Sequence, residues 1–119
     1  MDRAGEKLKR SRERLKLTFR DVEQASLKIA DRRGNDEFAI ALSRLADIEN
    51  KGTLPSIFRI YSLSAIYRLD FDEILRWYGV PRDQVPFDAM QIGIEQTHPA
   101  QLSVNIPPNI PSELDVEID

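Results

Sequence analysis

The sequence has no cysteine and a single histidine, His98. Without cysteine the chain can form neither a disulfide framework nor a thiolate metal site, and one histidine excludes the paired-histidine metal motifs. No apolar run approaches the roughly 18 residues that a membrane span requires. The charged amino terminus leads into more charge rather than an apolar stretch, so no secretory signal is expected. We therefore expect a cytoplasmic protein that uses no metal and no cofactor.

Proline is almost missing from the first 80 residues, where Pro55 is the one example, whereas six prolines follow. Charge changes along the chain as well: the net charge is about +5 over residues 1–33, about −2 over residues 34–80 and about −6 over residues 81–119. A chain of 119 residues is long enough for one domain with an arm. We predict a domain over residues 4–80 and an acidic, proline-rich tail over residues 81–119.

Apolar residues recur at helical spacing throughout the predicted domain. Thr18 and Asp21 have the spacing of a capping box. Asn35 or Asp36 is expected to cap a later helix, and Pro55 is expected in the first turn of the next one. The pattern predicts an all-α domain of five helices, at about residues 4–16, 18–31, 36–50, 55–67 and 70–77.

In the third predicted helix, Phe38, Ala41, Leu45 and Ile48 share one apolar face. In the tail the helical period disappears, and we expect extended chain. Residues 90–94 and 101–106 alternate apolar and polar side chains, so each could form a short strand. Two short strands are marginal alone, which favours a linker or a dimer arm as the role of the tail.

The segment from Leu45 to Ser56, which reads LADIENKGTLPS, precedes an apolar helix and the sequence LDFDEIL at residues 69–75. With one extra residue in the turn, it resembles the XRE/Cro/C1-type helix-turn-helix family, and residues 8–18 resemble that family's first helix and the start of its second. The similarity covers about residues 5–78. It implies a five-helix, lambda-repressor-like fold and a homodimeric transcription regulator that binds double-stranded DNA through the third helix.

A helix fits the major groove of DNA, where its exposed side chains meet base edges. Ser43, Arg44 and Asp47 project away from the predicted apolar face, so we expect them to contact bases. Arg44 is the strongest candidate, because a guanidinium can donate to both acceptors of a guanine. The alternative is that all three simply face solvent.

Further cations and polar residues are candidates for phosphate contact, with turn formation or a solvated face as the alternative for each. Phe19 stands where the family often has glutamine, which puts part of the usual readout in doubt. Glu49 would be a poor DNA ligand, and the resemblance implies an internal bond to a cation or a helix end. The phosphate candidates in the domain outside the insertion described next are Thr18, Arg20, Asn50, Lys51, Ser56 and Arg59.

The family needs a tight turn between its second and third helices, and this sequence has roughly a dozen additional residues in the region of residues 27–37. Either Lys28, Arg32, Arg33 and Asn35 add DNA contacts, or the insertion blocks the usual approach. We favour added backbone contacts, because two adjacent arginines beside a Gly-Asn turn suit phosphate.

An enzyme is not expected, because no nucleophile elbow or phosphate-binding glycine loop is present. The main alternative function is a protein-interaction, dimerisation or antitoxin-like module of the same fold. Phe58 and Tyr78 are the aromatic residues expected at the surface, where they could form a dimer contact. The acidic tail could also cover the basic first helix, although a linker or dimer arm is favoured over such masking.

Overall fold

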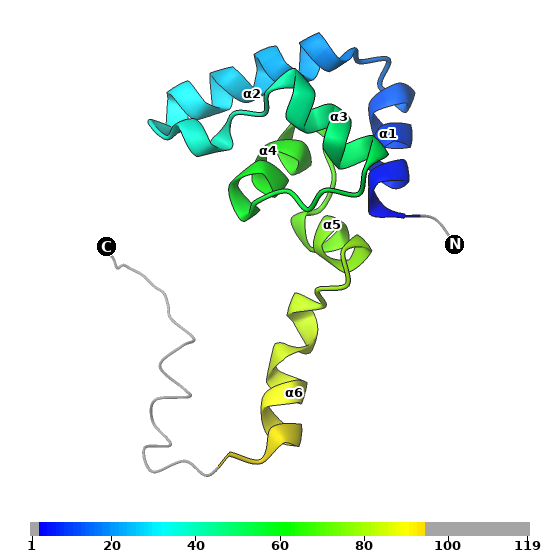
Figure 1. Cartoon of the computed structure of the whole chain (residues 1–119). Coiled ribbons are helices and arrows are strands. Elements are labelled where there is room, and N and C mark those ends of the chain that lie inside the picture. Colours follow the sequence, from blue (N-terminus) through cyan, green and yellow to red (C-terminus); the bar gives the residue numbers. More distant parts are fainter. Residues whose placement is uncertain (1–2, 95–119) are drawn as a thin grey trace. The chain divides into compact units, whose positions relative to one another are not determined.

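The computed structural model describes residues 3–94, which are helical and contain no strand (Figure 1). The chain divides after Val85 into two units, and the first of these, here called the head, holds the five longer helices of the domain. The elements are α1 (Ala4–Arg14), α2 (Phe19–Arg33), the 3-10 helix η1 (Asp36–Phe38), α3 (Leu42–Asn50), α4 (Ile57–Tyr67), α5 (Phe71–Trp77), the 3-10 helix η2 (Arg82–Gln84) and α6 (Val85–Ile92). The prediction of an all-α fold is confirmed for the described residues.

One apolar cluster holds the helices of the head together. Every helix from α1 to α5 contributes to it, as does the segment between η1 and α3. Burial of such side chains stabilises a fold by about 1.5–3 kcal/mol each, before the entropy of ordering the chain is subtracted. Its fully buried members are Leu8, Val22, Ile40, Leu45, Ile48, Leu63, Tyr67 and Ile74.

Local signals place the ends of α2 where the sequence predicts them. The Thr18 hydroxyl accepts a hydrogen bond from the Asp21 amide at 3.0 Å, and the Asp21 carboxylate accepts one from the Thr18 amide at 2.9 Å. This capping box confirms the predicted helix start. At the other end, Gly34 adopts the left-handed conformation with φ 65°, which favours glycine because it lacks a Cβ.

The helix expected over residues 36–50 begins only at Leu42, so its predicted start is wrong. Asn35 caps η1 instead, with its side-chain oxygen accepting from the Glu37 amide at 2.9 Å. Residues 39–41 are then extended. As a result Phe38 and Ala41 are not part of α3, and Ala41 is exposed rather than on the buried face.

Side chains from α2 and α4 hold the extended segment by its main chain. The Ile40 amide donates to the Ser26 hydroxyl at 2.8 Å. The carbonyl of Ala39 accepts from Arg59 Nε at 3.0 Å, and the carbonyl of Phe38 accepts from the Ser62 hydroxyl at 2.6 Å. Because these groups are bonded to distant side chains, they are not available for the helical ladder that the local pattern favours.

The first and third helices approach very closely at Gly5. A Cβ atom placed on Gly5 would lie 2.5 Å from the carbonyl oxygen of Ile48 and 2.8 Å from that of Glu49. Glycine therefore allows the backbones of α1 and α3 to meet. This close approach determines where α3 lies relative to α1.

Beyond the head, residues 85–92 form α6, so the predictions of extended chain there and of a strand at residues 90–94 are wrong. Pro86 lies in the first turn of α6, where a missing amide hydrogen costs little. Gly93 follows the helix with φ 65°. The other expected strand, at residues 101–106, lies outside the described residues. Within residues 3–94, no helix has the length and apolar character needed to span a bilayer.

Two smaller expectations about the head are also corrected. Pro55 precedes α4 rather than opening it, because Ser56 is the N-cap and its hydroxyl accepts from the Arg59 amide at 3.2 Å.

Tyr78 was expected at the surface, but its hydroxyl is buried, and this burial raises the pKa of Tyr78 to about 12. Phe58 is half-buried, and its ring packs edge-on against Phe38 with the ring centres 5.3 Å apart.

Candidate nucleic-acid interface

One side of α3 is anchored in the head and the other faces outward. Leu45 and Ile48 are fully buried on the inner side. Ser43 and Arg44 are on the other side with Arg44 exposed, and Asp47 is half-buried. The orientation expected for these three side chains from helical spacing therefore agrees with the structure.

The outward side of α3 continues to its carboxyl end. Asn50 and Lys51 are exposed, and the Lys51 ammonium lies 3.5 Å from the Asp47 carboxylate, one helical turn away. Such an exposed pair contributes little stability, so both groups remain available to a ligand. We call Ser43, Arg44, Asp47, Asn50 and Lys51 the outer face of α3.

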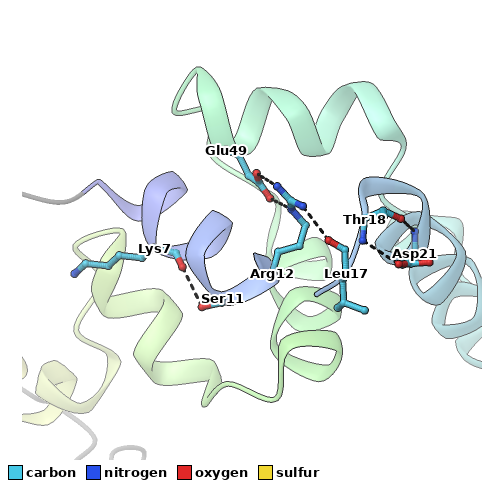
Figure 2. A network of polar contacts seen from close by, with 7 residues as sticks. All are labelled: Lys7, Ser11, Arg12, Leu17, Thr18, Asp21 and Glu49. Carbon is cyan, nitrogen blue, oxygen red and sulfur yellow. Dashed lines mark hydrogen bonds and ion pairs between the residues drawn. The ribbon is translucent and has the colours of Figure 1, made fainter. Parts of the chain in front are cut away.

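A buried ion pair fixes the carboxyl end of α3 to α1 (Figure 2). Arg12 Nε and Nη2 donate to the two carboxylate oxygens of Glu49 at 2.8 and 3.0 Å, and Arg12 Nη1 donates to the Leu17 carbonyl at 2.9 Å. The Glu49 side chain is only 1% exposed. The prediction of an internal partner for Glu49 is confirmed, and the hydrogen bond with Glu49 raises the pKa of Arg12.

Sequence reasoning did not identify Arg12 as the partner of Glu49. The signal was Glu49 itself, which follows Ile48 on the inner side of α3 and needs a cation once it is buried. Phe19 also contacts the ion pair, because the Arg12 guanidinium lies 4.6 Å from the centre of the Phe19 ring. Phe19, which stands where the similar family often has glutamine, therefore packs against the ion pair.

At the start of α2, Thr18 and Arg20 differ in how available their side chains are to a phosphate. The Thr18 hydroxyl takes part in the capping box, and the hydrogen bonds from Thr18 lower the pKa of Asp21 (Figure 2). Arg20 is exposed. Of the two predicted phosphate ligands here, Arg20 thus offers a charge at the surface.

The four candidate residues of the insertion differ in their contacts. Arg33 Nη2 donates to the Tyr61 hydroxyl on α4 at 2.9 Å, and Asn35 is used as the cap of η1. Lys28 lines a hollow between α2 and α4. Arg32 is exposed. Arg33 and Asn35 therefore have contacts within the head, whereas Lys28 and Arg32 are exposed one helical turn apart on α2.

Ser56 and Arg59, at the start of α4, have internal roles. Ser56 caps α4, and Arg59 holds the Ala39 carbonyl through its Nε. The guanidinium of Arg59 is partly buried by this contact. Both residues were predicted to bind phosphate; in the structure Ser56 begins α4, and Arg59 supports the segment that leads into α3.

No group of three or more potential metal-binding side chains occurs within residues 3–94. Among the features that the described part of the chain offers a ligand are exposed cations and the outer face of α3. Comparison with known proteins found no relative. No protein-family model, no curated protein and no solved structure matches the chain.

Proposed function

We propose that the chain is a transcription regulator that binds double-stranded DNA in a sequence-specific way, with a lambda-repressor-like arrangement of α1 to α5. The outer face of α3 enters the major groove in this proposal. The observation that carries it is the position of Arg44, exposed on a helix whose opposite side is buried through Leu45 and Ile48.

The residues of the outer face suit a base edge. Arg44 can donate to both acceptors of a guanine, whereas Asp47 can accept from the amino group of a cytosine. Arg12 and Glu49 connect the carboxyl end of α3 to α1, which holds the outer face of α3 in place relative to α1. Rigid display of a few polar groups is what sequence readout requires.

Phosphate contacts supply a large share of the affinity of such an interface. Arg20, Arg32 and Lys51 are exposed cations that can serve this role. The negative net charge of the whole chain does not oppose it, because the net charge is about +3 over residues 1–80 and about −6 over residues 81–119. A homodimer would place two copies of α3 on two half-sites.

The test is selection of bound sites from random double-stranded DNA, followed by titration of the selected site. Arg44→Ala should weaken binding to that site by about 5- to 150-fold, because a bidentate guanine contact discriminates by roughly 1–3 kcal/mol. Arg76→Ala, which removes an equal charge from an exposed position on α5, is the matched control and should change binding much less. Failure to enrich any sequence would refute the proposal.

A protein-interaction module remains the second candidate, and one observation favours it. Leu54 and Ile57 are 67% and 60% exposed, and Tyr61, one turn further along α4, is 39% exposed. Apolar side chains in such a row are suited to a partner surface or a dimer contact. An interaction module would show partner binding that Ile57→Ser abolishes, and no sequence preference for DNA.

A further inference from the structure

The hollow between α2 and α4 has a volume of about 430 Å³ and lies entirely within the head. It shares no residue with the outer face of α3. Leu17, at one end of the hollow, directs its side chain away from the Arg12–Glu49 pair (Figure 2). The walls consist of the aliphatic residues Leu17, Ala25, Ile29, Ala65 and Ile66, and the charged lining residues are Asp21, Lys28 and Arg68.

The aliphatic walls remain partly in contact with solvent. Leu17, Ala25, Ile29 and Ile66 are half-buried, and Ala65 is exposed. An apolar group that covered them would remove this surface from water, which is favourable. All five side chains are aliphatic, so the walls suit an aliphatic chain better than a ring that binds by stacking.

The charged residues of the hollow differ in what they already bind. The Asp21 carboxylate accepts from the Thr18 amide at 2.9 Å and so serves the start of α2. Lys28 and Arg68 are exposed, and no hydrogen bond or ion pair within residues 3–94 involves either side chain. The two cations exceed the one carboxylate, so the hollow attracts an anion.

Arg68 also has an unusual backbone. It is the residue that ends α4, and it adopts the left-handed conformation with φ 58° and ψ 45°. Glycine adopts this conformation without strain, as Gly34 does after α2, whereas a side chain makes it costly. Strained residues of this kind cluster at ligand-binding sites. The end of α4 therefore carries a guanidinium where glycine would be the more stable choice.

We propose that the hollow between α2 and α4 binds a small aliphatic carboxylate. Its chain lies against the aliphatic walls, and its carboxylate accepts hydrogen bonds from Arg68, whose planar guanidinium matches a carboxylate. Lys28 adds attraction from the α2 side. The volume of about 430 Å³ falls within the roughly 300–1,000 Å³ of sites that take small molecules.

The proposal does not depend on DNA binding, and its test uses no DNA. The probe is octanoate, added to the full-length chain with carbon-13 in its methyl groups. The methyl resonances of Ala25, Ile29, Ala65 and Ile66 should shift in a saturable way, because these residues line the hollow. Octan-1-ol, which lacks the charge, and acetate, which lacks the chain, should each bind at least about fivefold more weakly.

A matched pair of glycine substitutions separates recognition of the carboxylate from the backbone conformation. Arg68→Gly should weaken octanoate binding by about fivefold or more, while the thermal unfolding temperature stays equal or rises, because glycine favours a positive φ. Lys16→Gly removes the same charge from the other non-glycine residue with a positive φ within residues 3–94. Lys16 does not line the hollow, so this variant should bind octanoate as before.

A second pair, on α2, tests the other cation. Lys28→Gln should weaken octanoate binding, whereas Arg32→Gln removes an exposed charge one helical turn away and should preserve it. The absence of saturable shifts would overturn the proposal, as would equal affinity for octan-1-ol or equal losses in Arg68→Gly and Lys16→Gly. Shifts of the same methyl groups with protein concentration alone would also overturn it, because they assign the hollow to a second copy.

Discussion

Arg12 and Glu49 connect α1 to the end of α3 through two hydrogen bonds of 2.8 and 3.0 Å. Their side chains are 12% and 1% exposed, so the pair is largely withdrawn from water. A bidentate arginine–carboxylate contact fixes both distance and orientation. The position of the outer face of α3 therefore depends on a residue in a different helix.

Loss of one partner should be far more costly than loss of both. Arg12→Ala leaves the Glu49 carboxylate buried without its cation, and we expect the free energy of unfolding to fall by about 3–5 kcal/mol. The double substitution Arg12→Met with Glu49→Leu removes both charges and should recover most of that loss. Urea unfolding of the unaltered chain and these variants measures the difference, and a decrease below about 1 kcal/mol for Arg12→Ala would contradict the buried pair.

Gly5→Ala should destabilise the protein although alanine is the better helix former. In an exposed helix the substitution is favourable by about 0.5–1 kcal/mol. Here the added Cβ would collide with the Ile48 carbonyl oxygen, so α1 and α3 must separate, at a cost of about 1–3 kcal/mol. Thermal unfolding gives the sign, and Lys9→Ala, an exposed change in the same helix, should leave stability almost unchanged.

The capping box of α2 should make the free energy of unfolding depend on pH in the acid range. Because hydrogen bonds from Thr18 lower the folded-state pKa of Asp21, this stabilisation is present above the unfolded-state pKa, about 3.9, and is lost as pH falls below it. The stability difference between the protein and Asp21→Asn should accordingly shrink on acidification. Urea unfolding at neutral and acid pH tests this, and a constant difference would argue against the capping carboxylate.

In the alkaline range, the buried Tyr78 should make the stability of the protein fall as the pH rises. Its folded-state pKa is raised by burial to about 12, so the stabilisation is complete below the unfolded-state value of about 10 and is lost as pH rises from there toward 12. Burial raises the pKa of Tyr67 still further, so ultraviolet difference spectroscopy should show two tyrosines that ionise late, and Tyr78→Phe should remove the earlier of the two. Retention of the whole late component in Tyr78→Phe would show that another tyrosine produces it.

If the insertion binds the DNA backbone, Arg32→Ala with Arg33→Ala should reduce the dependence of binding on salt. The slope of log affinity against log salt changes by about 0.9 for each phosphate that is no longer neutralised, so a decrease of about 1 to 2 is expected. Tyr61→Phe removes the hydroxyl that accepts from Arg33 without altering charge, and serves as the control. An unchanged slope in the double variant would leave the insertion without a role in DNA binding.

Elements with local signals were predictable from the sequence, and elements that depend on distant contacts were not. The capping box of Thr18 and Asp21 and the left-handed Gly34 lie within a few residues of the ends they define. Leu45 and Ile48 likewise reveal the inner side of α3 by helical spacing. These features could be identified because each depends on its immediate neighbours.

The start of α3 was missed because it is decided by Ser26, Arg59 and Ser62, which lie 14 to 24 positions away from the residues they bind. The local pattern at residues 36–41 is compatible with a helix, and only those side chains make the extended form the better one. The partner of Glu49 lies 37 positions away, beyond any periodicity. Of the candidate site, the outward display of Arg44 was predictable, but the internal use of Arg59 was not.

The three side-chain bonds to residues 38–40 also have a consequence for recognition. A connection of this kind would ordinarily be mobile, and a ligand that met it would have to bear the entropy of ordering it. Here that entropy is lost during folding, before any partner arrives. The segment preceding α3 therefore behaves as a rigid spacer, and α2, α3 and α4 should meet a partner as one preformed body.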